Sequence, residues 1–542
     1  MKHTCILFVW LLVISTAAAA DWLQFGRTSE RNNVSPATGL PVEWNCGEFD
    51  RRTGAWKRDE AENILWVTPL GNESYGSPVI AAQKVFCATN NASGYLPRYP
   101  AEIDLGVLLC LDRASGSVLW QFSREKLAAG ASVDWPDQGI CSTPVVEGDR
   151  LWVVTNRGEV ACLDVEGFRD GENDGPFTAE PSSAENEADV IWIFDMMGEL
   201  GSVQHNMASC SPTLAGDLVL ACTSNGVDDS HRNVPAPQAA SFIALNKSTG
   251  KLVWADASPG ENIQHGQWGS PAFGVLGGVP QAIFPGGDGW LYSFRAEATA
   301  GGKPELLWKF DCNPKEAVWK DEGRGDRSEL VATPLIHEGR VYIATGHDPE
   351  FGEAPGHLWC IDPTKRGDVS PQLVVDRSGQ PAPPRRVAAV DAAAGETVQK
   401  NPNSAALWHY TGVDQNGDGS LDYEETMHRS LGTPAIHEGT LVTGDLAGVV
   451  HCLDAATGKP YWTHDLLAEI WGTPLIADGR IYIGDADGEM AVFTLGREKE
   501  LLAENDMGGS VYGAAAAVDG VLYIGTRTHI FAIGKQAVAP ER

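Results

Sequence analysis

The sequence predicts an all-β fold, an eight-bladed β-propeller, because two phrases recur along the chain. The first phrase joins an aliphatic pair, Asp or Asn, Thr/Ser-Gly and Trp; it reads CLDRASGSVLW at 110–120, IALNKSTGKLVW at 243–254 and CLDAATGKPYW at 452–462. The second places a small residue and Ser or Thr around a proline, at Pro78, Pro144, Pro212, Pro271, Pro334, Pro434 and Pro474, with Ala514–Ala517 in the eighth position. The last two prolines are 40 residues apart, which fits a four-stranded blade of about 40–50 residues.

The first unit shows how one blade is built. It contains four short runs that are rich in β-branched or aromatic residues and bounded by Gly and Asp, and these predict strands A to D at 77–80, 85–89, 108–112 and 118–122. The Thr/Ser-Gly pair between strands C and D supplies the positive φ that a tight hairpin needs. Seven units carry a Trp in strand D, at 66, 120, 192, 254, 308, 408 and 462, and we expect Leu501–Leu502 in the eighth.

The last unit lacks its fourth strand. Strands A to C are predicted at 511–518, 521–526 and 529–533, and a D-type strand with Trp66 stands alone at 64–67. We therefore expect the ring to close by N-terminal strand donation, which removes open sheet edges. A β-sandwich array or two smaller barrels is the alternative, which the eight matching positions disfavour.

The N-terminus carries a leader. Lys2 and His3 precede an apolar run and four alanines, the pattern of a signal peptide cleaved near Ala20 rather than of an uncleaved anchor. No later run approaches the ~20 apolar residues that span a bilayer. We expect a periplasmic or secreted monomer composed of a signal peptide (1–20), an N-terminal extension (21–61), the propeller (62–534) and a C-terminal tail (535–542).

Charge and composition exclude two classes of protein. The chain has 40 Lys and Arg against 72 Asp and Glu, a net charge of −32, so its surface repels phosphate backbones and nucleic-acid binding is excluded. Its 18 Trp, 16 Phe and 11 Tyr can fill a large core, which excludes wholesale disorder. Only the segment 363–405, rich in Pro, Ala and charge, is expected to be loosely ordered.

Residues 414–425, DQNGDGSLDYEE, match the loop of an EF-hand. Ca²⁺ prefers six to eight hard oxygens, Gly419 permits the sharp turn, and Glu425 at the last position can bind through both oxygens. The predicted ligands are Asp414, Asn416, Asp418, Ser420 through its carbonyl, Asp422 and Glu425. A single loop after a strand predicts a structural Ca²⁺ clip rather than a sensor, the alternative being a solvated acidic turn.

The Asp–Thr–Gly–Trp and Thr-Pro phrases resemble the pyrroloquinoline-quinone (PQQ) repeat family over residues 62–534. That family includes quinoprotein alcohol dehydrogenases and outer-membrane assembly scaffolds, all eight-bladed propellers. The catalytic members typically hold PQQ beneath a disulfide between adjacent cysteines, and this sequence has no Cys-Cys pair and no CxxCH haem motif. The resemblance therefore favours a non-catalytic scaffold that binds a protein or ligand, with a PQQ-dependent alcohol or sugar dehydrogenase as the alternative.

The candidate binding site lies on the rim shared by D-to-A and B-to-C loops, where quinoprotein-like propellers carry their ligand. Long D-to-A segments occur at 123–140, 195–209, 257–267, 311–330 and 411–430, and long B-to-C segments at 89–106, 223–240 and 345–356. Polar residues before strand A are expected to converge on a central funnel for a protein or a small polar ligand: His205, Asn206, His265, Gln267, Arg327, Glu329, His428 and Arg429. Simple solvated rim residues are the alternative, and Tyr75, Trp268, Trp471 and Tyr512 are expected to pack between blades.

The cysteines recur at equivalent strand positions. Cys110, Cys162, Cys360 and Cys452 occupy one strand-C site in different blades, which predicts small buried side chains rather than disulfide partners. Cys141 and Cys210, both directly before strand A, are the one pair for which a disulfide is hypothesised.

Overall fold

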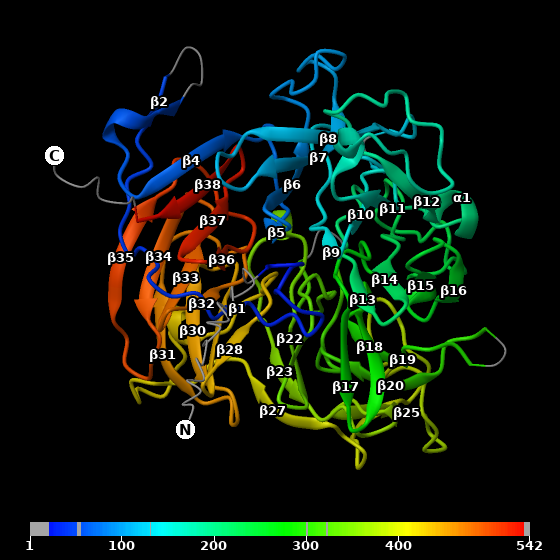
Figure 1. The fold of residues 1–542 in the computed structure, drawn as a ribbon. Coiled ribbons are helices and arrows are strands. Elements are labelled where there is room, and N and C mark those ends of the chain that lie inside the picture. The colour runs from blue at the N-terminus through cyan, green and yellow to red at the C-terminus, as the bar shows by residue number, and fades with distance from the viewer. Residues whose placement is uncertain (1–20, 51–55, 131, 300–301, 321–323, 536–542) are drawn as a thin grey trace, which may run out of the picture.

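A computed structural model of the protein describes residues 21–50, 56–130, 132–299, 302–320 and 324–535. The predicted signal peptide, and the C-terminal tail after residue 535, lie outside the described residues. In the described chain, eight sheets of four or five strands form a ring (Figure 1). The prediction of an all-β, eight-bladed propeller is confirmed. Among the described residues no helix has both the length and the apolar character needed to cross a membrane.

The first four blades follow one another along the chain, and within each the strands pair antiparallel with their sequence neighbours. Blade 1 consists of β5 (Val79–Ala81), β6 (Lys84–Asn90), β7 (Leu105–Asp112) and β8 (Val118–Glu125); blade 2 of β9 (Val145–Glu147), β10 (Arg150–Val154), β11 (Glu159–Asp164) and β12 (Val190–Asp195); blade 3 of β13 (Thr213–Ala215), β14 (Leu218–Cys222), β15 (Phe242–Asn246) and β16 (Leu252–Asp256); blade 4 of β17 (Ala272–Leu276), β18 (Val279–Pro285), β19 (Trp290–Arg295) and β20 (Leu306–Asp311).

Blades 5 to 7 continue this order, whereas blade 8 takes one strand from the N-terminal region. Blade 5 consists of β21 (Leu335–His337), β22 (Arg340–Ala344), β23 (Leu358–Ile361) and β27 (Ala406–Tyr410); blade 6 of β28 (Ala435–His437), β29 (Thr440–Gly444), β30 (Val449–Asp454) and β31 (Pro460–Asp465); blade 7 of β32 (Leu475–Ala477), β33 (Arg480–Gly484), β34 (Glu489–Thr494) and β35 (Leu501–Asp506); blade 8 of β36 (Ala516–Val518), β37 (Val521–Gly525), β38 (His529–Gly534) and β4 (Ile64–Pro69). In blade 8, β4 pairs antiparallel with β38 and places Trp66 opposite Ala532.

In addition to the four strands of each blade, the described chain contains several short elements. They are β1 (Val34–Ser35), β2 (Glu48–Phe49), β3 (Trp56–Lys57), β24 (Gly367–Asp368), β25 (Gln372–Val375), β26 (Thr397–Lys400), the helix α1 (Met196–Leu200) and the 3₁₀ turns η1 (Arg58–Glu60), η2 (Gly167–Asp170), η3 (Gly260–Asn262), η5 (Pro349–Phe351) and η6 (Tyr423–Glu425).

The repeated phrase is explained by a contact between neighbouring blades. Trp192 of blade 2 lies over the C-to-D turn of blade 3, where its indole N–H donates to the carbonyl of Lys247 at 3.2 Å. Gly250 in that turn has φ +68°, and a Cβ there would lie 2.6 Å from the Trp192 ring. The turn therefore needs glycine both for its backbone and for the space that the indole fills. The same contact joins Trp66 to Gly116 and Trp408 to Gly458.

Small residues in strand C accommodate these indoles. Cys162 lies opposite Trp192, and the other three cysteines predicted at this site likewise face the Trp of strand D. In blade 7 the corresponding pair is Val492 and Ala503, so the position expected for Leu501–Leu502 is held by Ala503. All ten cysteines of the described chain are buried free thiols, which contradicts the hypothesised disulfide between Cys141 and Cys210.

The N-terminal segment lies in the centre of the ring, where Figure 1 shows it in dark blue. Residues 22–35 contact the inner strand of every blade, in order. The contacts are Trp22 with Ile80, Leu23 with Val146, Gln24 with Thr213, Ser29 with Phe273, Glu30 with Ile336, Asn32 with Ile436, Asn33 with Ile476 and Ser35 with Ala517. Because strand A is the inner edge of its sheet, these hydrogen bonds pair backbone groups that the blade leaves free, except in blade 3, where the side chains of Gln24 and Thr213 bond each other.

Arg31 is the buried centre of this segment. Its guanidinium is fully enclosed and donates to the backbone carbonyls of Pro271 at 2.9 Å, Ser211 at 2.8 Å and Pro212 at 3.2 Å, and thus joins blades 3 and 4. Burial lowers the pKa of Arg31 to about 10, so it stays charged at neutral pH.

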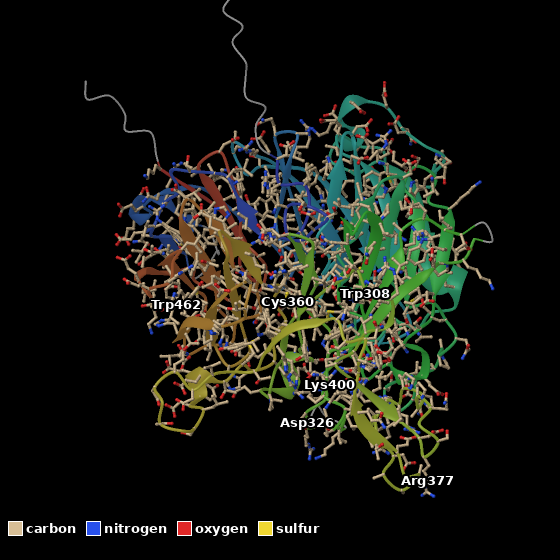
Figure 2. All side chains as sticks on the ribbon, turned by 90° about the horizontal axis from the view of Figure 1, so that it is seen from below. Trp308, Asp326, Cys360, Arg377, Lys400 and Trp462 are labelled. Carbon is tan, nitrogen blue, oxygen red and sulfur yellow. The ribbon has the colours of Figure 1, made fainter. Side chains whose placement is uncertain are left out.

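The insertion 363–405 is folded, which contradicts the expectation of loose order. β24 adds to blade 4 in parallel with β20, and β25 pairs with β26 in a hairpin. Arg385 and Glu396 form a bidentate ion pair at 2.6 and 2.7 Å. Figure 2 shows Arg377 at the outer end of this projection. Local hydrogen bonds and ion pairs order the segment, together with buried apolar residues such as Val369 and Ala405, which belong to the core.

We predict that Arg31→Met destabilises the ring. Four carbonyls, of Phe25, Ser211, Pro212 and Pro271, lose their donor. One unsatisfied buried group costs about 1–3 kcal/mol, so the free energy of unfolding should fall by on the order of 3 kcal/mol, measured by urea denaturation. Arg27→Met is the matched control, because Arg27 also has a positive φ (65°) but makes no side-chain hydrogen bond among the described residues. Equal denaturation midpoints for the two variants would contradict the prediction.

Candidate functional site

A pocket of about 320 Å³ lies on the rim formed by D-to-A and B-to-C loops. Residues that precede strand A in several blades form most of its wall, and the B-to-C loops of blades 3 and 5 complete it. Its lining is Tyr75, Trp135, Gln138, Cys141, Asn206, Met207, Ser209, His231, His265, Trp268, Val331, Asp348, Pro349, Glu350, Phe351, Leu431 and Trp471. The site is therefore built by loops from segments far apart in the sequence.

Aromatic rings form one side of the pocket. Tyr75, Trp471 and Tyr512 stack on one another, with ring centroids 5.4 Å apart for the two tyrosines and 4.4 Å apart for Trp471 and Tyr512. Trp135 leaves 44% of its surface exposed beside them. Tyr75, Trp268, Trp471 and Tyr512 were expected to pack between blades. Tyr75, Trp471 and Tyr512 do stack across blades 1, 7 and 8, and Tyr75, Trp268 and Trp471 also line the pocket. They give it an apolar wall that can hold a side chain or a ring of a ligand.

Three histidines meet beside Trp268, whose ring centroid lies 4.7 Å from that of His265. His205 precedes β13, His231 lies in the B-to-C loop of blade 3, and His265 precedes β17. The Nε2 atoms of His205 and His265 are 2.9 Å apart, and the His231 ring lies 4.9 and 4.8 Å from the two other rings. His205 and His265 are buried, whereas His231 is half-exposed.

Two carboxyl groups lie behind His265. Its Nδ1 is 3.6 Å from Asp348 Oδ2 and 4.0 Å from Glu329 Oε1. Glu329 also interacts with His347, whose Nδ1 lies 2.9 Å from the same oxygen, and it accepts the backbone N–H of Gly266 at 3.2 Å. The cluster thus combines imidazoles and carboxyl groups from blades 3, 4 and 5.

Burial changes the protonation of this cluster. Removal from water disfavours a charged imidazole, and it lowers the pKa of His205 to about 4 and that of His347 to about 3. The pKa of His265 also lies well below its usual value, first through burial and then through the neighbouring histidines. Burial raises the pKa of Glu329 to about 8 and that of Asp348 to about 6. At neutral pH the buried rings are therefore neutral and carry free lone pairs.

The structure brings together four of the residues expected at the funnel: His205, Asn206, His265 and Glu329. The other four belong to other networks. Gln267 bonds the backbone of Pro285 and Gly287, Arg327 pairs with Asp311 at 3.1 Å, His428 lies 3.2 Å from Asp445, and Arg429 donates to Ser328 Oγ and the Gly325 carbonyl. The position of a residue directly before strand A determines the rim on which the residue lies, but not the direction in which its side chain points.

Four functional residues were missed by the sequence analysis: His231, His347, Asp348 and Phe351. All lie in the long B-to-C segments 223–240 and 345–356, which share the rim with the D-to-A loops. The unusual length of those B-to-C segments was therefore the sequence signal for these residues. The candidate site residues had been chosen only from the positions before strand A.

The insertion 363–405 reaches the pocket through Arg386. Its guanidinium donates to the carbonyls of His231 at 2.9 Å and Gln264 at 2.7 Å, and to that of Arg232. The turn that carries His231 is also held by the Asp228 side chain, which accepts from the Asn233 side chain at 2.9 Å. His231 is thus held from blade 3 and from the insertion.

The predicted calcium loop is closed at its neck. Gly412 bridges to Thr426, and the Val413 N–H donates to the Glu425 carbonyl at 3.1 Å. Glu425 Oε1 accepts the N–H groups of Gln415 at 2.9 Å and Asn416 at 3.1 Å, so the last position of the loop contacts its beginning. The loop lies over blade 6, where Tyr423 donates to the Ala447 carbonyl at 3.4 Å.

Comparisons with known proteins agree with this architecture. The family described as outer membrane protein assembly factor BamB matches residues 384–533. The chain is 22% identical over 400 residues to the outer membrane protein assembly factor BamB of Shewanella oneidensis. The aligned region covers 71% of this chain and 79% of that protein. This chain resembles the PQQ-repeat propellers of the BamB type.

Two further likenesses are more limited. The crystal structure of BamB from Moraxella catarrhalis superposes with a TM-score of 0.50 at 14% identity, covering 87% of this chain and 99% of that one, and so shares the fold. A cytochrome c-linked 1-butanol dehydrogenase of Thauera butanivorans is 27% identical over 152 residues, which is 27% of this chain and 20% of that protein. The chain thus spans about a fifth of that dehydrogenase and most of the length of its BamB-type relative.

We predict that Arg386→Gln frees the turn that carries His231. A hydrogen bond to a charged donor contributes about 1.5–3 kcal/mol, so amide hydrogen exchange at residues 227–231 should accelerate at least about tenfold through local opening. Arg377→Gln, at the outer end of the same insertion, should leave those amides unchanged. Identical exchange in both variants would show that the insertion does not support the pocket.

Proposed function

We propose that the protein is an exported, non-catalytic scaffold that acts as a monomer and binds a partner protein at the rim around the pocket. The observation that carries the proposal is the aromatic pocket itself, which loops of several blades build on one rim. Interfaces concentrate their binding energy where aromatic side chains are desolvated by the bound partner. The similarity to BamB, named as an outer membrane protein assembly factor, supports a role in protein assembly, and the predicted signal peptide supports a periplasmic or secreted location.

The lining indicates the kind of segment that would bind. Trp135, Trp471 and Tyr75 offer aromatic faces, and Asp348 and Glu350 add carboxyl groups. Aromatic faces beside carboxylates attract a cationic or aromatic side chain. The net charge of −32 would steer a basic partner segment towards the protein. An extended segment that inserts one Arg, Lys or aromatic residue fits this site best.

PQQ does not fit the same pocket. PQQ is a tricarboxylic acid, and the described lining contains two acidic residues and no Lys or Arg, so a buried PQQ would lack cationic partners. Reconstitution of the purified protein with PQQ and Ca²⁺ is expected to give no alcohol-dependent dye reduction. Turnover that requires the quinone would restore the dehydrogenase alternative.

The scaffold proposal is tested by photo-crosslinking in cells. A photoreactive residue at Trp135 or at Leu467, which is 86% exposed on the same rim, should capture the same partner, identified by mass spectrometry. Adding Trp471→Ala to the Trp135 probe should reduce the yield, because the apolar anchor pocket is opened.

Val275 is the matched position on another face, since it is 65% exposed in the inner strand β17 close to an A-to-B turn. A probe there should capture nothing. If it captures the same protein as strongly, or if the rim probes capture none, the rim is not the binding surface.

We infer that the ring is held closed by the N-terminal strand. Support comes from the pairing of β4 with β38 and from Trp66, whose indole donates to the Arg113 carbonyl of blade 1 at 3.0 Å. Trp66 thereby joins blade 8 to blade 1 as the other tryptophans join consecutive blades.

We also propose that residues 414–425 bind one Ca²⁺ as a structural clip, with Asp414, Asn416, Asp418, Ser420, Asp422 and Glu425 as its ligands. The contact of Glu425 with Gln415 and Asn416 supports this, because it brings the last ligand position of the loop next to the first ones. Binding would fix the connection between blades 5 and 6.

For the clip, Glu425→Gln should weaken Ca²⁺ binding and abolish the rise in melting temperature on Ca²⁺ addition. Binding stabilises the folded state by about 2.7 kcal/mol when Ca²⁺ is a hundredfold above Kd. Differential scanning calorimetry with Ca²⁺ and with chelator measures this. Glu424→Gln, at an exposed neighbouring position outside the ligand set, should behave like the wild type. A wild-type melt that chelator does not change would contradict the clip.

A further inference from the structure

The histidine cluster offers a binding chemistry that partner recognition does not use. His205, His231 and His265 each present one ring nitrogen, and the three nitrogens all lie within 4.8 Å of one another. Three imidazoles around one point are the usual protein ligands of Zn²⁺ and of similar transition-metal ions. In a tetrahedral zinc site the bond length of about 2.0–2.1 Å places ligand nitrogens about 3.3 Å apart, so small shifts of these rings would suffice.

The hydrogen bond behind His205 fixes which nitrogen faces the others. Its Nδ1 lies 2.9 Å from the Val227 carbonyl oxygen, and a carbonyl can only accept, so Nδ1 carries the proton. In the neutral ring Nε2 then holds a lone pair, and this atom faces His265 Nε2 at 2.9 Å. A backbone carbonyl on the far nitrogen is a common support of a metal-binding histidine.

His265 has the corresponding support from carboxyl groups. Its Nδ1 is buried and has no hydrogen-bond partner among the described residues, and it faces Asp348 at 3.6 Å and Glu329 at 4.0 Å. An ion on Nε2 would place the proton on Nδ1, where it would point at these carboxyl groups. Carboxylate–histidine–metal chains of this kind orient the ring and strengthen the ligand.

His231 connects the cluster to solvent. It is half-exposed and lines the pocket together with His265, so an ion can reach the three nitrogens from the pocket. The fourth coordination position would face the pocket as well. The turn at 228–233 and Arg386 hold His231 in place, as described above.

We propose that His205, His231 and His265 bind one divalent transition-metal ion of the kind that prefers imidazole, with Zn²⁺ as its representative, and that Asp348 and Glu329 support His265 from behind. The proposal goes beyond the scaffold function and does not depend on it, since metal binding is measured without a partner. The ion would join blades 3 and 4 at the wall of the pocket and leave one position open to a ligand group.

A second arrangement shares His265. His265, Glu329 and His347 also bring their ligand atoms within 4.8 Å of one another, around the opposite nitrogen of His265. We favour the three-histidine site because His205 and His265 already face each other and because it opens to the pocket through His231, whereas His347 and Glu329 are fully buried. A variant of His347 separates the two.

The experiment uses the purified mature chain, stripped with chelator and kept in excess Ca²⁺ so that the loop at 414–425 does not compete. Isothermal titration with Zn²⁺ and metal analysis after dialysis should give one tight site per chain. His231→Asn should weaken Zn²⁺ binding by more than the about 10–100-fold that loss of an outer partner causes. Asparagine is chosen because His231 has φ +57°, which asparagine tolerates. His205→Gln should have the same effect, and Asp348→Asn should cost about 10–100-fold.

His409→Gln is the matched control. His357 and His409 also face each other, with Nδ1 and Nε2 3.0 Å apart, but they are not part of either three-ligand group found among the described residues. This variant should bind Zn²⁺ like the wild type. Co²⁺ gives a second readout, since its visible absorption reports nitrogen ligands in a tetrahedral field and should disappear in His231→Asn.

Circular dichroism identifies variants that fail to fold, and the half-exposed position of His231 keeps its variant informative if His205→Gln does not fold. The proposal is overturned if the wild type binds no Zn²⁺ beyond the level of folded His231→Asn. It is equally overturned if His347→Gln abolishes binding while His231→Asn does not, because the ion would then lie at the second arrangement.

Discussion

The backbone edge of strand A is the constraint on which the rest of the structure depends. Each blade directs the unpaired edge of its innermost strand towards the axis, where a row of N–H and C=O groups needs partners. Residues 22–35 supply partners to all eight blades of the described ring, one after another, and Arg31 fills the space between blades 3 and 4. The N-terminal extension is therefore part of the core rather than an appendage to it.

This arrangement places function on one rim. The N-terminal segment lies along the inner strands, whereas the pocket is formed by residues that come before those strands. A loop on that rim can lengthen without disturbing the hydrogen bonds at the axis, since the ring holds its ends in place. The segments that carry His231 and His347 use this freedom. The insertion that carries Arg386 instead connects strands C and D of blade 5, and it reaches the turn of His231 through Arg386.

The two walls of the pocket follow different physical rules. The aromatic wall of Tyr75 and Trp471 offers apolar area and suits a side chain of a partner. The histidine wall is polar, and it brings one ring nitrogen of each of His205, His231 and His265 within 4.8 Å of the others. Neutral imidazoles beside carboxyl groups suit a metal cation, and the two proposed roles share the carboxyl group of Asp348, which lines the pocket and faces His265.

The sequence by itself determined the blades. The Asp–Thr–Gly–Trp phrase recurs because of a contact between neighbouring blades. The indole of one blade lies against the glycine turn of the next, as Trp192 does with Gly250. Because such contacts recur once per blade, they are visible as a repeat in the sequence. The repeat predicted the order of the strands and the strand-C position at which the cysteines lie opposite the tryptophans. The lone strand with Trp66 was visible for the same reason.

Only the tertiary structure decided the site. Whether a residue before strand A points into the pocket depends on the neighbouring loops, and identical positions gave different results: His265 faces the pocket, whereas His428 turns to Asp445. His231 and His347 come from loops without any repeat, and Arg386 contacts His231 from an insertion two blades away in the chain. The Arg386 contacts join segments more than a hundred residues apart. Contacts of this kind leave no periodic pattern in the sequence because each occurs once.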